Sequence, residues 1–230
     1  METNVSSLKN TARIAGVWYL LLAITGVYSI IYVPSKIMVR GDAVATANNI
    51  LANEFLFRTG IISDLISNTI FMLLVLVLYR LFKQVNEHKA KLMVALVIVQ
   101  IPAVFFMEAF NITSLMILKG EILKTFELNQ RQDLAMLFLK INDYGTLTLE
   151  MFWGLWLLPF GQLVYKSGFI PRMFGVLLII GGMAYIIESL THLLLPNYGA
   201  FVSQYTFVFY TIGELSIMLW LLIKGVKTKV

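Results

Sequence analysis

Long apolar stretches separated by short polar segments make up almost the whole chain. The first covers residues 14–33, and about 20 residues at 1.5 Å each are enough to cross a hydrocarbon core of about 30 Å. Five further stretches of similar length cover residues 57–79, 92–118, 144–165, 173–195 and 204–223. The pattern predicts an all-α, polytopic membrane protein with six transmembrane helices, and we expect residues 1–230 to form a single integral membrane domain.

Two connections on one side of the predicted bundle contain helical patterns of their own. Asp42 can cap a helix that continues to about residue 57 with apolar side chains at helical spacing, which predicts a short interfacial helix between spans one and two. Residues 134–141 carry apolar side chains on one helical face. This segment is expected either to form a second interfacial helix or to extend span four.

Glycine and proline predict turns and kinks at other places. Gly168 and Pro171 can end one helix and begin the next, so spans four and five are expected to form an antiparallel hairpin. Residues 199–203 are expected to be the loop between spans five and six. Pro102 and Pro159 are expected to kink spans three and four.

The composition supports a membrane protein and excludes several other classes. Hydrophobic residues make up 59% and charged residues 13% of the chain, against about 45–50% and about 25% in soluble domains. The chain contains no cysteine, which excludes disulfides and thiolate metal sites. The formal charge of +5 comes from short basic clusters at the ends of apolar stretches, so it indicates membrane orientation and not binding to nucleic acid.

The distribution of these basic residues predicts which way the chain faces. With the amino terminus in the cytoplasm, eleven of the 18 Lys and Arg residues lie inside and seven outside. Because the cytoplasmic side carries the excess of Lys and Arg, we expect both termini to be cytoplasmic.

Several short segments together resemble a known family. They are ARIAG at 12–16, GDAVATA at 41–47, FRTGIISDL at 57–65, LYRL at 78–81, YKSGFIPR at 165–172, GVL at 175–177 and WLLIKG at 220–225. With these segments the chain resembles the bacterial membrane family catalogued as domain of unknown function four-three-eight-six. The resemblance implies a multi-spanning protein of the bacterial inner membrane, and it implies no catalytic or binding residues.

Five acidic side chains interrupt the apolar spans. An ionisable residue at the centre of a membrane helix costs about 2.5–3.5 kcal/mol on insertion scales, so these groups are expected to face the interior of the bundle. Helical spacing places Asn, Asp or His side chains on the same faces as four of the acids. We therefore expect one acidic polar cavity that opens outward and narrows towards Glu214. Its expected residues are Asp64, Asn68, Glu108, Asn111, Asp143, Glu150, Glu188, His192 and Glu214.

Other interpretations of these residues remain open. Polar side chains in membrane interiors also join one helix to another without binding any ligand. Glu188 and His192 could supply two metal ligands, but stronger metal, phosphate and dinucleotide motifs are missing from the sequence, so no metal and no cofactor is expected. Aromatic residues that include Tyr19 and Trp156 are expected to mark the membrane interfaces.

Three classes of function are compatible with this pattern. They are given in order of preference, with an enzyme last. The first is an accessory membrane protein that binds a small ligand or a lipid in the outer cavity. The second is a small transporter coupled to protons or cations, in which the carboxyl groups carry the ion. The third is an intramembrane metal-dependent hydrolase that uses Glu188, His192 and a neighbouring carboxyl group. The partners expected from the sequence are the lipid bilayer and a small ligand or lipid.

Overall fold

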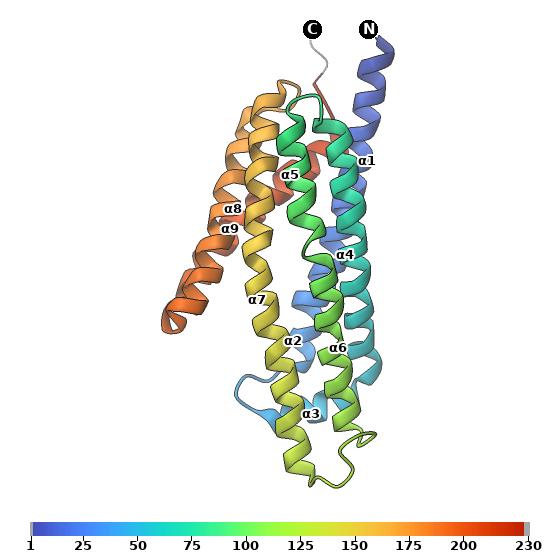
Figure 1. Cartoon of the computed structure of the whole chain (residues 1–230), viewed down its shortest axis with the longest axis vertical. Helices are drawn as coiled ribbons and strands as arrows, with labels where there is room; N and C mark the ends of the chain where they lie inside the picture. Colours follow the sequence, from blue (N-terminus) through green and yellow to red (C-terminus); the bar gives the residue numbers. More distant parts are fainter. Residues whose placement is uncertain (1, 228–230) are drawn as a thin grey trace. The chain divides into compact units, whose positions relative to one another are not determined.

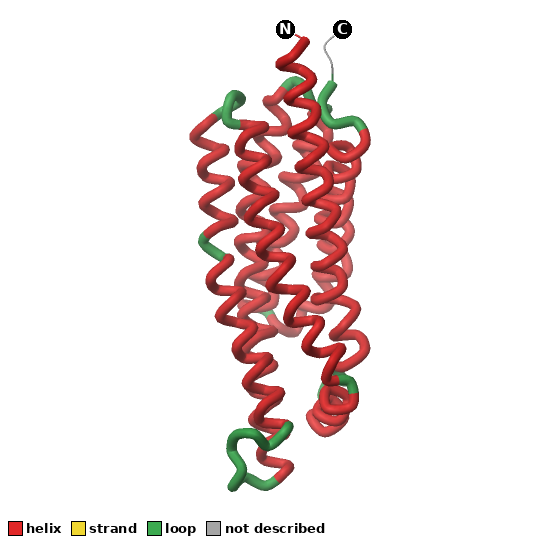
Figure 2. The backbone as a smooth tube through the Cα atoms, turned by 90° about the vertical axis from the view of Figure 1, so that its right-hand side faces the viewer, coloured by secondary structure: helices red, strands yellow, loops and turns green. Residues whose placement is uncertain are grey.

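The computed structural model describes residues 2–227, with side chains from residue 6, and this part of the chain contains helices and loops but no strand (Figure 2). Figure 1 labels the helices along the chain. In order, the elements are α1 Glu2–Gly26, the π-helix η1 Val27–Tyr32, α2 Val33–Ile37, α3 Ala43–Ala52, α4 Glu54–Phe82, α5 Glu87–Ile98, α6 Ile101–Leu118, α7 Leu128–Ser167, α8 Arg172–Leu194 and α9 Pro196–Ile223.

The predicted fold class is confirmed. Within the described residues, six helical stretches are long and apolar enough to cross a membrane. They are Ser6–Ile37, Glu54–Phe82, Glu87–Leu118, Leu128–Ser167, Arg172–Leu194 and Pro196–Ile223. Many of their large apolar side chains are exposed, as expected where lipid is the solvent. The chain is therefore a multi-pass membrane protein.

The expected short helix between spans one and two is α3. It begins as predicted, because the carboxylate of Asp42 accepts a hydrogen bond from the backbone N–H of Ala45 at 2.8 Å. It ends at Ala52, earlier than expected, because Asn53 leaves the helical conformation (φ −123°, ψ 40°). The second span, α4, then begins at Glu54.

The fourth span contains the longest helix. Residues 134–141 do not form a separate helix, and the alternative prediction holds, since α7 runs for 40 residues through both segments. Pro159 lies inside α7 and removes one backbone donor, but the helix continues past it.

Spans one and three are each interrupted close to a proline. In the third span, α5 ends at Ile98 and α6 begins at Ile101, so the break directly precedes Pro102, which fits the first turn of a helix. In the first span, η1 precedes Pro34, and the N–H of Val33 bonds to the carbonyl of Tyr28 five residues earlier. Pro102 was expected to kink its helix, and the structure shows a larger effect, because the helix stops and restarts there.

The prediction of a loop at residues 199–203 is wrong, because these residues lie within α9. The turn is made at Leu195 (φ −135°, ψ 62°), and α9 begins at Pro196, whose missing N–H would have no helical partner in that position anyway. Gly199 lies inside α9 and next to the imidazole of His192, since a Cβ there would lie 2.5 Å from Nδ1. This glycine provides room for a ring and does not mark a loop.

Contacts divide the chain into two compact units. Unit 1 comprises Met1–Leu21, Ile70–Gln100 and Leu147–Val230, and unit 2 comprises Leu22–Thr69 and Ile101–Thr146.

Unit 1 is built on close contacts between helix backbones. In the hairpin of α7 and α8, Gly154 faces Gly182 and Gly161 faces Gly175, so that an added Cβ would lie 2.4–2.7 Å from a carbonyl oxygen of the opposite helix. Gly16 of α1 lies equally close to the backbone of α9 at Leu222. These small residues let the helices approach closely, as is typical of membrane bundles.

Unit 2 is built around a buried apolar cluster. Its members come from α2, α3, α4, α6 and the first part of α7, and they are Val33, Ile37, Ala47, Ile50, Phe57, Ile61, Leu115, Ile117, Leu118, Ala135 and Leu139. The loop that joins α6 and α7 adds Ile122 and Leu123 to the edge of this cluster. The short helices α2 and α3 are thus held by apolar packing.

Candidate functional site

The residues expected to line one cavity belong to both units. Unit 1 contains Glu150, Glu188, His192 and Glu214, and unit 2 contains Asp64, Asn68, Glu108, Asn111 and Asp143. The single cavity therefore stays a prediction.

Glu214 of α9 joins two other helices of unit 1. Its Oε2 accepts a hydrogen bond from Tyr19 Oη of α1 at 2.7 Å, and its Oε1 accepts one from Tyr185 Oη of α8 at 3.0 Å. Each carboxylate oxygen thus has a phenol donor from a different helix. The arrangement stabilises a polar group that would be costly to expose to lipid.

Aromatic rings lie next to this carboxyl group. Tyr185 stacks on Tyr210 with ring centroids 3.9 Å apart and planes 9° apart, and the ring of Trp153 meets Tyr185 edge-on at 6.0 Å. The three rings come from α7, α8 and α9, so they join the same helices that carry the acidic residues of unit 1.

Glu188 and His192 both bind side chains of α9. Thr206 Oγ1 donates to Glu188 Oε2 at 2.6 Å, and Ser203 Oγ lies 2.9 Å from His192 Nε2. Glu188 is buried, with 7% of its surface exposed. The spacing of four residues therefore places both side chains towards α9, as the shared helical face predicted, and each has its own hydroxyl partner.

Glu150 of α7 differs from the other carboxyl groups of unit 1. Its charge interacts with that of Glu188, and both interact with Tyr210. Its Oε2 is buried and has no hydrogen-bond partner within residues 2–227. A buried acceptor without a donor is costly, so this oxygen needs a proton, a cation or a ligand donor.

We name Glu150, Glu188 and Glu214, with the rings of Trp153, Tyr185 and Tyr210, the α7–α9 cluster. All six side chains belong to unit 1.

The acidic residues of unit 2 form a second group. Asn111 Nδ2 donates to Glu108 Oε2 at 3.0 Å, which confirms the pairing expected from their spacing of three residues. Ser29 Oγ of the π-helix lies 3.5 Å from Asp64 Oδ1, and the carboxyl groups of Asp64 and Glu108 interact with each other. The π-helix thus places a hydroxyl group beside an acidic side chain.

Two of the expected residues take little part in this second group. Asn68 Nδ2 donates to the backbone carbonyl of Asp64 at 3.0 Å and not to its carboxyl group. Asp143 is exposed on α7. Asn142 beside it turns inwards instead and donates to the carbonyl of Met107 at 2.9 Å.

The arrangement offers no ready metal centre. Within the part of the chain that the structure describes, no three His, Asp or Glu side chains are placed to hold a metal ion. Glu188 and His192 each bind a different hydroxyl group of α9.

Several partners of the acidic residues were not expected from the sequence. Tyr19 and Trp156 were expected at membrane interfaces, but only 3% and 2% of their surfaces are exposed, and both lie within unit 1. Tyr185 and Thr206 carry no local signal of their role. The general expectation that a buried tyrosine hydroxyl needs a polar partner could have suggested such pairs, but not which ones.

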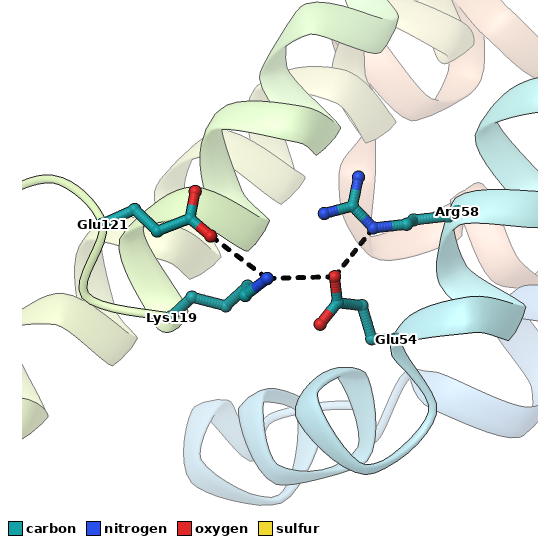
Figure 3. A network of polar contacts seen from close by, with 4 residues as sticks. All are labelled: Glu54, Arg58, Lys119 and Glu121. Atoms are coloured by element: carbon teal, nitrogen blue, oxygen red, sulfur yellow. Dashed lines mark hydrogen bonds and ion pairs between the residues drawn. The ribbon is translucent and has the colours of Figure 1, made fainter.

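Unit 2 also contains a network of charged side chains (Figure 3). Glu54 Oε1 lies 2.8 Å from Arg58 Nε and 3.2 Å from Lys119 Nζ, and Lys119 also contacts Glu121 at 3.1 Å. The hydrogen bonds to Glu121 and then Glu54 raise the pKa of Lys119. The network links the start of α4 to the end of α6.

Comparison with known proteins places the chain in a family. An uncharacterized protein of Archaeoglobus fulgidus is 40% identical over 93 residues, which are 38% of this chain and 54% of that protein, so the match spans about half of the relative's length. No solved structure matches the chain. Residues 14–225 match the family described as "Domain of unknown function (DUF4386)", and this match over most of its length confirms the resemblance seen in the sequence. The chain therefore belongs to the DUF4386 family of membrane proteins.

Proposed function

We propose that this protein binds a small ligand with an amine or ammonium group at the α7–α9 cluster, and that it acts by binding and not by catalysis. The observation that carries the proposal is the buried Oε2 of Glu150, which lacks a hydrogen-bond donor beside a second carboxyl group, that of Glu188.

The surrounding chemistry favours a cationic ligand. Two neighbouring carboxylates in a medium of low dielectric constant repel each other, so a positive charge between them stabilises both. Aromatic faces also attract ammonium groups, and Trp153, Tyr185 and Tyr210 supply three rings close by. Glu214 already has two phenol donors, so it is expected to hold the helices while Glu150 contacts the ligand.

Thermal unfolding of the purified protein in detergent can test the proposal. The probes are tetramethylammonium and ethylammonium, with glycerol as a neutral control. We expect the two cations to raise the melting temperature of the wild type and to have no effect on Glu150→Gln. The matched control is Asp133→Asn, which removes an exposed carboxylate of the same helix and should keep the response. Equal shifts in Glu150→Gln and wild type would contradict the proposal.

A cation-coupled carrier is the second candidate function, and the interrupted helices favour it. Spans one and three contain the π-helix and the break at Val99–Gln100, and interrupted helices often form ion and substrate sites in transporters. Flux of labelled tetramethylammonium into proteoliposomes across a pH gradient tests this function. A carrier would show flux in the wild type and lose it in Glu214→Gln, whereas a binding protein would respond in the melting assay and show no flux.

We also propose that the protein lies in the bacterial inner membrane with both termini in the cytoplasm. The distribution of Lys and Arg supports this orientation, since eleven of them are predicted to lie inside and seven outside. The start of α1 and the end of α9 are close in unit 1, where Arg13 Nη2 donates to the carbonyl of Ile223 at 3.4 Å.

Reporter fusions test this orientation. Fusions after Gln84 and Ser167 should report cytoplasm, and one after Leu195 should report the opposite side. Leu195 is the suitable site because the chain turns there, whereas residues 199–203 lie within α9. A cytoplasmic signal at Leu195 would contradict the proposed orientation.

A further inference from the structure

A shallow groove lies between α4 and α5 of unit 1, away from the α7–α9 cluster. Its volume is about 270 Å³, and it is lined by Leu76, Tyr79, Lys91, Val94 and Ala95. The lining is almost entirely apolar apart from the Tyr79 hydroxyl and the Lys91 ammonium group. Leu76 is 40% exposed, so the groove opens to the surroundings of the helices.

The groove lies where two spans end. Leu76 and Tyr79 belong to the last two turns of the span Glu54–Phe82, and Lys91, Val94 and Ala95 belong to the first turns of the span Glu87–Leu118. Tyrosine and lysine are common at the boundary between hydrocarbon and headgroups, because each has an apolar body and a polar tip. A molecule in this groove therefore meets hydrocarbon at one end and headgroups at the other.

A basic segment of the chain adjoins the groove. Arg80 and Lys83 each follow a lining residue of α4, Leu76 or Tyr79, by four positions, so helical spacing places them on the same helix face. Residues 76–95 contain four Lys and Arg residues, Arg80, Lys83, Lys89 and Lys91, and one acid, Glu87. Glu87 already has two polar partners. Its Oε1 lies 3.0 Å from Lys91 Nζ and accepts a hydrogen bond from Tyr79 Oη at 3.4 Å. Lys89 Nζ donates to Gln162 of α7. Within residues 2–227, Arg80 and Lys83 have no salt bridge, and both are exposed.

We infer that this groove binds an anionic phospholipid, with one acyl chain along Leu76, Val94 and Ala95 and the phosphate at Arg80 and Lys83. Charge complementarity selects the lipid class, because a basic segment next to an apolar channel fits a negative headgroup joined to a hydrocarbon chain. Lys91 and Glu87 form a neutral pair at the side of the groove, so the net positive charge next to the groove comes from Arg80 and Lys83. The site is independent of the ligand proposed for the α7–α9 cluster.

Photo-crosslinking of the full-length protein can test the inference. The protein is reconstituted in phosphatidylcholine vesicles that contain a small fraction of phosphatidylglycerol with a diazirine on one acyl chain. After illumination, mass spectrometry should find the label on peptides that contain residues 76–79 and 91–95. The same diazirine on phosphatidylcholine should label these peptides several-fold less.

Two variants separate the headgroup contact from the chain contact. Arg80→Gln with Lys83→Gln should lower the labelling by about fivefold for each charge removed, the effect expected for a basic residue at an anionic surface. Ala95→Phe should block the groove and reduce labelling by either lipid. The matched control, Lys166→Gln with Lys224→Gln, removes two exposed basic residues of unit 1 outside the groove and should leave the labelling unchanged.

Three results would overturn the inference. The first is equal labelling by both lipids, and the second is labelling that persists in the Arg80 and Lys83 variant. The third is a dimer that is crosslinked through these peptides, which would assign the groove to a second copy of the chain. The charge variant alters only exposed side chains and is expected to fold, so the test does not depend on Ala95→Phe.

Discussion

The two units of this protein pack their helices in different ways. In unit 1, glycines bring backbones together, and a Cβ at Gly154 or Gly16 would lie 2.4 Å from a backbone atom of another helix. In unit 2, the glycines of the helices meet side chains instead, since a Cβ at Gly145 or Gly60 would approach Met107 or Val33. Contact between backbones cannot adjust to a larger residue, whereas contact with a flexible side chain can.

The polar features of the two units are more alike than their glycines. Each unit has hydrogen bonds between helices, such as Tyr185 to Glu214 in unit 1 and Asn142 to Met107 in unit 2. Each also has a helix with a side-chain cap, at Asn86 in unit 1 and at Asp42 in unit 2. Close glycine contacts between backbones are therefore the feature of packing that distinguishes unit 1.

The charges follow the same division. Unit 1 has eleven basic and five acidic residues, a formal charge of +6, and unit 2 has seven basic and eight acidic residues, a formal charge of −1. A basic region is attracted to anionic lipid surfaces, and a nearly neutral one is not.

The largest expected effect tests the glycine contacts. Gly154→Ala should destabilise the protein by about 2–3 kcal/mol, because the new methyl group overlaps the carbonyl oxygen of Gly182 and neither backbone can move freely. Gly145→Ala in unit 2 is the matched control and should change stability by less than about 1 kcal/mol, since the end of Met107 can rotate away and alanine favours the helix. Unfolding in mixed detergent measures both. Similar losses in the two variants would remove the distinction between the units.

A smaller effect is expected at the hydrogen bonds of Glu214. Tyr185→Phe should cost about 1.5 kcal/mol, because it leaves one carboxylate oxygen without its donor. Glu214→Gln should cost less, since an amide can accept from one tyrosine and donate to the other. The same unfolding assay compares them. A greater loss in Glu214→Gln would show that the negative charge matters more than the hydrogen bonds.

The helix caps offer a comparison of similar features in both units. Asp42→Ala in unit 2 and Asn86→Ala in unit 1 each remove a side-chain acceptor for a backbone N–H at the start of a helix. Each should cost about 1 kcal/mol. Hydrogen exchange should show faster exchange at Ala45 in the first variant and at Lys89 in the second. Unchanged exchange at either amide would mean that the cap does not stabilise its helix.

The smallest effect is expected at the exposed network of unit 2. Glu54→Gln removes the carboxylate that pairs with Arg58 and Lys119, and it should lower the melting temperature slightly at low salt. The difference from wild type should disappear at about 1 M NaCl, where charges are screened within about 3 Å. A loss that persists at high salt would show that Glu54 acts through packing.

Features with local causes could be predicted from the sequence. The six spans, the cap at Asp42 and the disturbance at Pro102 depend on residues close together in the chain, and the structure confirms them. The turn between α8 and α9 could not be placed correctly. Glycine is common in loops, so Gly199 indicated a loop, but in the structure it lies in a helix and makes room for the ring of His192.

The partners of the acidic residues depend on packing between distant helices. The sequence identified Glu214 and Glu188, but it could not show that Tyr19, Tyr185 and Thr206 donate to them, since these pairs are 18 to 195 residues apart. Nor could it divide the nine expected residues between two units, because that division depends on contacts along the whole chain.

The π-helix in the first span has a consequence for how this gene can change. A π-turn holds one more residue than an α-turn, so deleting one residue within Val27–Tyr32 can restore a regular helix while the residues beyond it keep their faces. Val33 and Ile37 would then stay in the apolar cluster of unit 2, and the contact at risk is the one between Ser29 and Asp64. A deletion in a regular α-helical turn would instead rotate everything beyond it by about 100°, so the π-helix is the part of this span that can lose one codon at the least cost to packing.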